Sequence, residues 1–232
     1  MKTKFDIIGF DADDTLWINQ LNYDECEKKY CGLLSNYLTQ KEISNELYKT
    51  EMRNLSDYGY GAKSFTLSMI ETAVRVSNGE VSSSAINEII NLGKTLINKP
   101  VVLLNGVKIV LEFFKKAGIK LILVTKGDLI DQERKLKKSK IEKFFHHIEI
   151  MSDKKESDYL SLLSHLDIKP ERFIMIGNSL KSDIIPVLNI GGFGVHVQYH
   201  ATWQHENVSK IEKHPNLIEV EDIAQIISFF SA

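Results

Sequence analysis

Cysteine is scarce in this sequence, and its two cysteines are poorly placed for a disulfide. Among 232 residues, only Cys26 and Cys31 carry a thiol. They lie in a stretch with helical periodicity, where their spacing places the two side chains on different faces of the helix. This arrangement argues against a disulfide bond and is typical of a protein in a reducing cytosol.

Long apolar runs and an excess of one charge are also missing. No run approaches the roughly 20 apolar residues of a membrane-spanning helix. No small-residue cleavage site follows the amino-terminal segment 1–6, which leads straight into a strand. The 29 basic and 31 acidic residues give a formal net charge of -2, too small to attract nucleic acid or anionic lipid. We therefore expect a soluble, cytoplasmic protein with no nucleic-acid or membrane partner.

From residue 106 onward, strand patterns alternate with helical patterns. Short apolar runs predict strands at 120–125, 147–151, 172–177, 194–198 and 217–220. Amphipathic or charged segments predict helices at 107–116, 128–140, 156–166 and 180–189, the last with a kink or a break at Pro186, and a closing helix from 221. With a first strand from Ile7, this order predicts an α/β fold in which helices cover both faces of a parallel sheet. Ligands of such sheets lie beyond the carboxyl ends of the strands.

Residues 18–100 show helical patterns only. The predicted helices lie at 23–40, 41–54, 64–77 and 82–97. This block interrupts the α/β pattern directly after the first strand. We therefore expect a helical domain of residues 18–100 inserted into a core domain made of residues 1–17 and 101–232.

Three carboxylates crowd the end of the first predicted strand. Asp11, Asp13 and Asp14 directly follow the apolar run that begins at Ile7. Successive strand residues point to opposite faces, so Asp11 and Asp13 leave the strand on the same side. Two carboxylates held so close repel each other unless a cation or a shared proton compensates. The expected use is a Mg²⁺ site beside a nucleophilic carboxylate, with Asp14 serving as a turn or cap residue.

Further polar residues follow the next two predicted strands of the core. Thr125, Lys126 and Gly127 supply a hydroxyl group and backbone N–H groups at the start of a helix, an arrangement that suits phosphate oxygens. Lys154 and Lys155 follow the strand after it, where an ammonium group can neutralise both a phosphate and a nucleophile. These residues predict a phosphate-binding edge of the sheet.

The fourth core strand also ends in polar residues. Gly177 allows the chain to turn tightly, and Asn178 and Asp183 supply oxygen ligands for a hard cation. In this order, the motifs resemble those of the haloacid dehalogenase-like (HAD) hydrolase superfamily. The matching residues are Asp11, Asp13, Thr15, Thr125, Lys154, Gly177, Asn178 and Asp183. The resemblance implies a three-layer, Rossmann-like core, and the helical block resembles the C1 cap of the family.

The resemblance also implies a role for each matching residue. Asp11 would attack phosphorus and become an aspartyl phosphate, while Asp13 would protonate the leaving alcohol and then activate water. Thr125 would bind a phosphate oxygen, and Lys154 would stabilise the developing charge. A Mg²⁺ cofactor would neutralise the clustered anions. Its implied ligands are Asp11, the backbone carbonyl of Asp13, Asn178 and Asp183.

Two positions leave the assignment open. The fourth motif of the family usually begins with Gly-Asp, and Asn178 replaces that acid. Asparagine keeps an oxygen ligand but removes one negative charge, which predicts weaker metal binding and makes Asp183 the more important acidic ligand. Counting back from Tyr159 by the usual spacing of the family implies that Lys154 is the catalytic lysine, and Lys155 is the alternative.

The segment 57–63 alternates tyrosine and glycine between two predicted helices. Tyr58, Tyr60 and Lys63 suit contact with the leaving group of a substrate, which predicts a specificity loop. A simple interhelical loop, with the tyrosines packed on the helical domain, is an equal alternative.

Several other polar residues have ordinary structural explanations. Ser179 and Ser182 follow a strand and precede a helix, where serine commonly serves as a helix cap. The spacing of His196, His200 and His205 lacks the pairing that a transition metal requires, so we expect a polar loop.

These expectations favour a Mg²⁺-dependent phosphohydrolase that acts on a small phosphorylated metabolite. Asp13 argues against a dehalogenase, since dehalogenases similar to this chain generally lack the second aspartate. A phosphomutase and a phosphate-binding or phospho-accepting module without hydrolysis are the remaining alternatives. Because no helix shows a sustained heptad pattern, we expect either a monomer or a homodimer.

Overall fold

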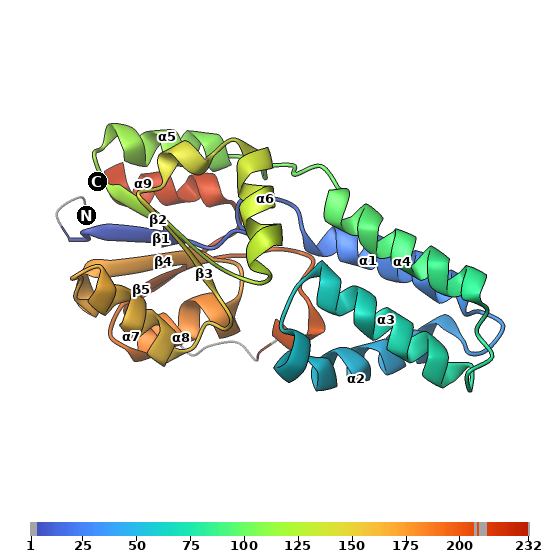
Figure 1. Cartoon of the computed structure of the whole chain (residues 1–232). Coiled ribbons are helices and arrows are strands. Elements are labelled where there is room, and N and C mark those ends of the chain that lie inside the picture. Colours follow the sequence, from blue (N-terminus) through green and yellow to red (C-terminus); the bar gives the residue numbers. More distant parts are fainter. Residues whose placement is uncertain (1–3, 207, 209–212, 232) are drawn as a thin grey trace. The chain divides into compact units, whose positions relative to one another are not determined.

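The computed structural model describes residues 4–206, 208 and 213–231 of the chain. A six-stranded sheet with all strands parallel has the order β3-β2-β1-β4-β5-β6 (Figure 1). The strands are β1 (Ile7–Phe10), β2 (Lys120–Lys126), β3 (His147–Met151), β4 (Phe173–Gly177), β5 (Phe193–Val197) and β6 (Leu217–Val220). The sheet confirms the predicted α/β fold, and each strand lies within a residue or so of its predicted position.

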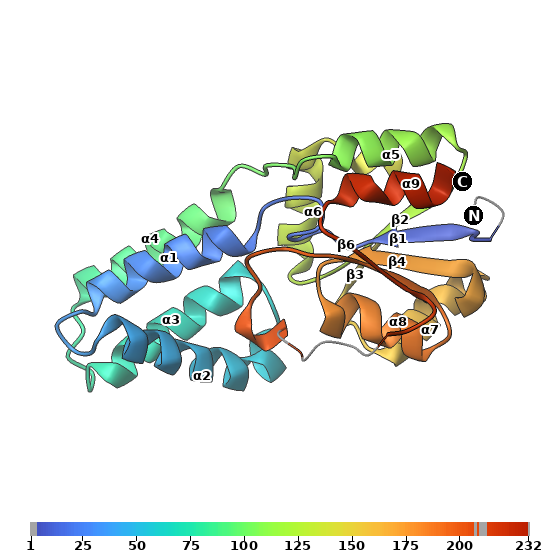
Figure 2. The ribbon, with the colours of Figure 1, turned by 180° about the vertical axis from the view of Figure 1, so that it is seen from behind.

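Helices cover both faces of the sheet, so that this part of the chain has three layers (Figures 1 and 2). Its helices are α5 (Val107–Lys116), α6 (Leu129–Ser139), α7 (Glu156–His165), α8 (Ile185–Asn189) and α9 (Ile226–Ser231). Ile8 and Phe10 of β1 belong to one hydrophobic cluster with α5 and α9, while Ile7 belongs to another with α7 and α8. Because both faces are buried, the central strands are continuous apolar runs.

The strand order reverses at β1, which lies between β2 and β4. Since all the strands are parallel, the residues that follow β1, β2, β3 and β4 meet at one edge of the sheet. This is the edge at which open α/β sheets bind their ligands.

The chain folds into two compact units, and each unit has its own hydrophobic core. The α/β unit comprises residues 1–20, 101–126 and 132–232, and the helical unit comprises residues 21–100 and 127–131. The four long helices before the second strand are α1 (Gln20–Leu33), α2 (Gln40–Tyr58), α3 (Ala62–Val76) and α4 (Ser83–Asn98). The core that they bury includes Tyr30, Leu47, Met69 and Ile89.

The first two helices differ from the prediction in where they end and begin. The predicted helix 23–40 ends at Leu33. Thr39 adopts an extended backbone conformation and begins α2 through a capping box, in which the Thr39 side chain accepts from the Glu42 N–H and the Glu42 carboxylate accepts from the Thr39 N–H. An extended residue cannot belong to a continuous helix. The helix α2 then continues to Tyr58, beyond the predicted residue 54.

The predicted helix 180–189 consists of two segments. A π-helical turn spans Leu180–Ile184, and α8 follows it with Pro186 near its amino-terminal end. Proline lacks an N–H donor and fits only the first turn of a helix, so the break falls where Pro186 predicted it.

Neither a membrane-spanning helix nor a disulfide is found among the described residues. No helix in this part of the chain is both long and apolar enough to cross a bilayer. Cys26 and Cys31 are free and buried, and burial raises the pKa of each thiol to about 11. Cys26 and Cys31 form no disulfide bond with each other, in agreement with the prediction from their spacing.

Candidate active site

Asp11 is the buried residue that directly follows β1. Its Oδ1 accepts a hydrogen bond from Lys154 Nζ at 2.6 Å, and its Oδ2 accepts one from Thr15 Oγ1 at 3.1 Å. Burial and then the carboxylate of Asp183 raise the pKa of Asp11 to about 7, against the opposing effect of Lys154. The side chain is thus held in a fixed orientation while its negative charge is incompletely compensated.

Lys154 lies after β3 and is 3% exposed. Its Nζ donates to Asp11 Oδ1 and, at 2.7 Å, to Asp183 Oδ1. Burial alone lowers the pKa of Lys154, but the two carboxylates outweigh burial and raise the pKa above its ordinary value. Lys155, by contrast, is exposed and pairs with Asp153 at 3.0 Å. Of the two candidates, Lys154 is therefore the lysine that contacts Asp11.

Asp183 reaches the cluster from the π-helical turn after β4. Its Oδ2 accepts a hydrogen bond from the N–H of Ser179 at 3.0 Å. A Cβ atom at Gly177 would lie 2.3 Å from this Oδ2, so only glycine leaves room for the carboxylate. Ser179 also caps the turn, because its Oγ accepts from the N–H of Ser182 at 3.0 Å, as predicted for a serine at this position.

Thr15 connects Asp11 with Asn178. Its Oγ1 accepts a hydrogen bond from the N–H of Asn178 at 3.0 Å and lies 3.1 Å from Asn178 Oδ1. Because a hydroxyl group has one proton, Thr15 can donate to Asp11 or to Asn178, but not to both at once. This contact gives Thr15 a bracing position between the ends of β1 and β4.

Asp13 belongs to a second cluster, which it forms with residues of α6. Lys135 Nζ lies 2.6 Å from Asp13 Oδ1 and 2.7 Å from Oδ2. Trp17 Nε1 donates to Oδ1 at 2.6 Å, and Gln132 Nε2 donates to Oδ2 at 3.2 Å. The same amide nitrogen of Gln132 lies 2.6 Å from Thr125 Oγ1. Gln132 therefore links a residue that follows β1 with a residue near the end of β2.

The ammonium group of Lys126 pairs with Glu206, which lies in the segment between β5 and β6. Its Nζ lies 2.5 Å from Glu206 Oε1 and 2.9 Å from Ser182 Oγ. Glu206 Oε2 accepts from Ser179 Oγ at 2.5 Å and from Ser182 Oγ at 2.6 Å. Although burial alone raises the pKa of Glu206, Lys126 and the two serines lower it to about 2. Gly127, which completes the predicted phosphate cradle, adopts a left-handed φ of 138°.

Asp14 has the structural role that the sequence predicted for it. Its carboxylate accepts hydrogen bonds from the N–H groups of Asn19 (2.8 Å) and Gln20 (2.9 Å), at the point where α1 begins. Burial raises the pKa of Asp14 to about 7, although these N–H groups act in the opposite direction. The residue therefore stabilises the first turn of α1 and does not join the Asp11 cluster.

The predicted specificity loop is shorter in the structure than in the sequence pattern. Tyr58 ends α2 and is 49% exposed, and Lys63 already lies in α3. The reason is that α2 continues past its predicted end and α3 begins at Ala62, which leaves only residues 59–61 between them. Tyr60 lies in this remaining link, and Lys63 Nζ pairs with Asp128 at 2.7 Å.

Several residues of these clusters were not among the predicted site residues. They include Trp17, Gln132, Lys135 and Glu206. One signal was available for two of them, since Gln132 and Lys135 are three residues apart and therefore share a face of the predicted helix after β2.

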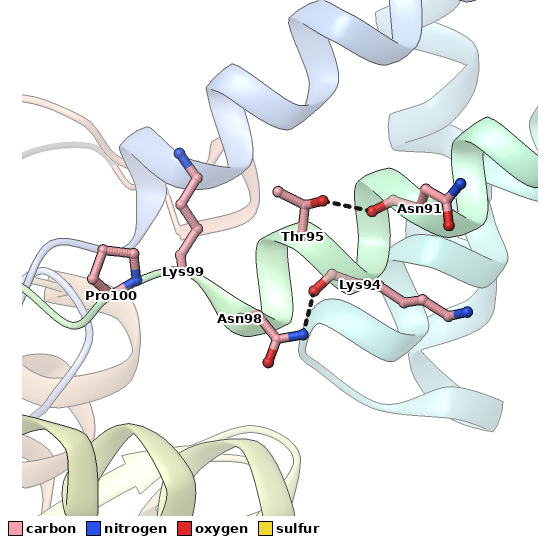
Figure 3. Close-up of a pocket in the computed structure, with 6 residues that line it drawn as sticks. All are labelled: Asn91, Lys94, Thr95, Asn98, Lys99 and Pro100. Atoms are coloured by element: carbon pink, nitrogen blue, oxygen red, sulfur yellow. Dashed lines mark hydrogen bonds between the residues drawn. The ribbon is translucent and has the colours of Figure 1, made fainter.

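A separate hollow lies on the helical unit, along α4 (Figure 3). Its lining consists of Asn91, Lys94, Thr95, Asn98, Lys99 and Pro100. The polar groups drawn there are largely used within the helix itself, since Thr95 donates to Asn91 O and Asn98 donates to Lys94 O. Lys99 pairs with Glu25 at 2.5 Å. The hollow contains none of the residues of the sheet edge.

The donor set after β1 and β4 suits a hard cation. Among the described residues, no group of three or more His, Cys, Asp or Glu side chains is close enough to hold a metal without other ligands. Oxygen ligands from an amide and a backbone carbonyl are, however, ordinary for Mg²⁺. Two buried carboxylates, Asp11 and Asp183, share the single ammonium group of Lys154. One further positive charge would balance this cluster.

This fold and this set of strand-end residues agree with the comparison to known families. The haloacid dehalogenase-like hydrolase family matches residues 5–191. The match covers most of the chain, and the chain belongs to this family of hydrolases. No curated protein matches the chain.

Solved structures with the same fold include several hydrolases. The chain is 36% identical to a haloacid dehalogenase-like family hydrolase from Xanthomonas campestris, over 98% of this chain and 91% of that one, with a TM-score of 0.89. A predicted phosphoglycolate phosphatase from Haemophilus somnus is 17% identical over 98% of both chains, with a TM-score of 0.64. L-2-haloacid dehalogenase from Xanthobacter autotrophicus, with chloropropionic acid covalently bound, is 11% identical over 98% and 99%, with a TM-score of 0.66. The last two similarities concern the fold alone.

Proposed function

We propose that this hydrolase is a Mg²⁺-dependent phosphomonoesterase that acts on a small phosphorylated metabolite through an aspartyl-phosphate intermediate. The observation that carries the proposal is the pair formed by Asp11 and Asp13. Asp11 is buried and oriented by Lys154, while Asp13 is held separately by Lys135. Two carboxylates in different environments suit two different tasks, nucleophilic attack and proton transfer.

In the proposed reaction, an oxygen of Asp11 attacks phosphorus as the bond to the leaving oxygen breaks. Asp13 gives its proton to that oxygen and releases the alcohol. Asp13 then takes a proton from water as the water attacks the aspartyl phosphate, which releases inorganic phosphate and restores the Asp11 carboxylate. Thr125 and Lys154 stabilise the phosphoryl oxygens, with Lys126 and Gly127 as further phosphate-binding groups.

The Mg²⁺ ion would be held by the Asp11 carboxylate, the Asp13 backbone carbonyl, Asn178 and Asp183. When bound, it would neutralise the clustered anions and align the phosphoryl group with Asp11. The two carboxylates of Asp11 and Asp183 share one ammonium group, and this excess of negative charge supports the cofactor. The neutral Asn178 predicts a modest affinity for it.

We further propose that the helical unit serves as a C1-type cap that selects the substrate. The unit begins at Leu21, shortly after residues 11–17 in the chain, where the sequence predicts the inserted helical domain. Tyr58, Tyr60 and Lys63 are the proposed contacts for the leaving group. To contact a substrate, the Lys63 ammonium group would have to leave its ion pair with Asp128.

Hydrolysis of 4-nitrophenyl phosphate tests the proposal. The purified protein should release nitrophenol in the presence of Mg²⁺ and lose activity with a chelator. Asp11→Asn should lower the rate about a thousandfold or more, because it removes the nucleophile. Asp6→Asn is the matched control, since Asp6 is an exposed acid that precedes the same strand and pairs with Arg172 at the surface.

A dehalogenase is the second candidate, favoured by the absence of an acid at position 178. Chloride release from 2-chloropropionate without any phosphatase activity would establish that alternative and refute the phosphomonoesterase. Phosphatase activity that survives in Asp11→Asn would refute the nucleophile assignment. A panel of phosphorylated metabolites would then identify the substrate.

A further inference from the structure

Within the described part of the chain, the side chains that contact the Asp13 carboxylate are all hydrogen-bond donors. The donors are the ammonium group of Lys135, the indole N–H of Trp17 and the amide N–H of Gln132. We propose that Lys135 is a positioning residue, which holds Asp13 in the orientation needed to activate water in the second half of the reaction. This inference rests on the proposed phosphatase function and assigns a task to a residue outside the family motifs named above.

Of the three donors, Lys135 is the one that contacts both oxygens of the Asp13 carboxylate. Its Nζ lies 2.6 Å from one oxygen and 2.7 Å from the other, so it spans both oxygens of the carboxylate. The side chains of Lys135 and Asp13 are 15% and 24% exposed. A largely shielded pair interacts more strongly than a pair in bulk water, where exposed ion pairs contribute little.

The direction of these contacts shows how Asp13 is held. Each oxygen of the Asp13 carboxylate accepts a hydrogen bond from Lys135, Oδ1 accepts a second one from Trp17, and Oδ2 accepts a second one from Gln132. The orientation of the carboxylate is therefore fixed through both of its oxygens. A fixed orientation is needed when water attacks the aspartyl phosphate: Asp13 takes a proton from the water, a bond forms between the water oxygen and phosphorus, and the bond from phosphorus to Asp11 breaks.

Gln132 extends the cluster toward the phosphate-binding residues. It is 3% exposed, and its amide nitrogen contacts both Asp13 Oδ2 and Thr125 Oγ1. Since Gln132 and Lys135 belong to the same helix, α6 fixes the proposed base and the proposed phosphate ligand together.

A purely structural role for Lys135 makes a different prediction. Lys135 Nζ also lies 3.2 Å from Asn19 Oδ1, a contact that by itself would only stabilise the loop before α1. Loss of this stabilising contact would slow both half-reactions equally. Loss of a positioning residue for the base would slow only the hydrolysis of the intermediate.

Rapid-mixing kinetics with 4-nitrophenyl phosphate separate these roles, because nitrophenolate leaves without needing a proton. In Lys135→Met, a burst of nitrophenol should be followed by a steady state about tenfold or more slower than in the wild type. Both kcat and KM should fall while kcat/KM stays within about threefold, because the first half-reaction is unaffected. Lys135→Arg should restore most of the turnover, since arginine also offers a positive charge and several donors.

Lys138→Met on the same helix is the matched control, because Lys138 is exposed, and it should behave like the wild type. If Lys135→Met does not fold, Trp17→Phe removes a single donor and should change the same ratio of burst rate to turnover in the same direction. An equal loss in kcat and kcat/KM without a burst would overturn the inference and leave the phosphatase intact. A wild-type protein without phosphatase activity would overturn the proposed function itself.

Discussion

At the scale of single residues, the carboxylates of the site differ in how far a lysine compensates their negative charge. Asp11, Asp183 and Lys154 form a buried cluster with one more negative than positive group. Asp13 and Glu206 each have a lysine of their own, Lys135 and Lys126. Among the carboxylates that a lysine contacts at this edge of the sheet, the unbalanced charge therefore lies in the cluster around Asp11, where a cation and a phosphoryl group are expected to bind.

The comparison of Lys154→Met with Lys155→Met tests this distribution of charge. Removing Lys154 leaves two buried carboxylates without a cation, which should lower the free energy of unfolding by about 3 kcal/mol and abolish phosphatase activity. Lys155 is exposed and pairs at the surface, so its removal should change the free energy of unfolding by less than about 0.5 kcal/mol. Urea unfolding and steady-state rates measure both effects. Equal effects of the two substitutions would contradict the assignment of Lys154.

At the scale of elements, the positions of strands were more predictable than the ends of helices. Strand periodicity and the apolar character of a doubly covered sheet located all six strands. The break before Pro186 followed from the chemistry of proline. The end of α1 at Leu33 was missed, although Thr39 and Glu42 have the spacing of a capping box. The capping-box residues lie between two segments that both have helical apolar periodicity, and this periodicity predicted one helix continuing to residue 40.

The turn after β4 depends on a glycine at its first position. In Gly177→Ala, the new Cβ would lie 2.3 Å from Asp183 Oδ2, so the Asp183 carboxylate would be displaced from Lys154. We expect a loss of about 1–3 kcal/mol in the free energy of unfolding and a higher Mg²⁺ concentration for half-maximal activity. Gly32→Ala in α1 is the control, because nothing lies within 4 Å of its new Cβ. It should be neutral or slightly stabilising, and a neutral Gly177→Ala would contradict the packing argument.

At the scale of the whole molecule, the α/β unit and the helical unit each bury hydrophobic clusters of their own. The helical unit contains charged residues that burial disfavours. Glu51 in α2 has its pKa raised to about 8, first by burial and then by the carboxylate of Glu27 in α1. Between pH 4.5, the ordinary pKa of a glutamate, and about pH 8, Glu51 therefore binds more protons in the folded state than in the unfolded state. Its contribution to stability is fully present below pH 4.5 and is lost as the pH rises through 8.

Glu51→Gln should accordingly stabilise the protein at pH 8 and have little effect at pH 4.5. An increase on the order of 1–3 kcal/mol in the free energy of unfolding is expected at the higher pH, because glutamine cannot ionise. Thermal or urea unfolding across this pH range measures the effect. Glu71→Gln in α3 is the control, since Glu71 is exposed, and it should change the free energy of unfolding by less than about 0.5 kcal/mol. A pH-independent effect of Glu51→Gln would contradict the raised pKa.

The sequence by itself determined the sheet and the identity of the residues at its carboxyl edge. Asp11, Thr125, Lys154 and Asp183 lie at or after the ends of four strands, and parallel strands bring their carboxyl ends together whatever the details of packing. Local periodicity and turn chemistry are sufficient for such an inference, because both act over a few residues of chain.

Only the tertiary structure decided which side chains hold which carboxylate. Lys135 is 122 positions beyond Asp13, and Lys126 is 80 positions before Glu206. No local pattern specifies such pairs, since they depend on which helix lies beside which strand end and on how deeply each ion pair is buried. The different surroundings of Asp11 and Asp13 therefore result from long-range packing, while the presence of both aspartates is evident from the sequence.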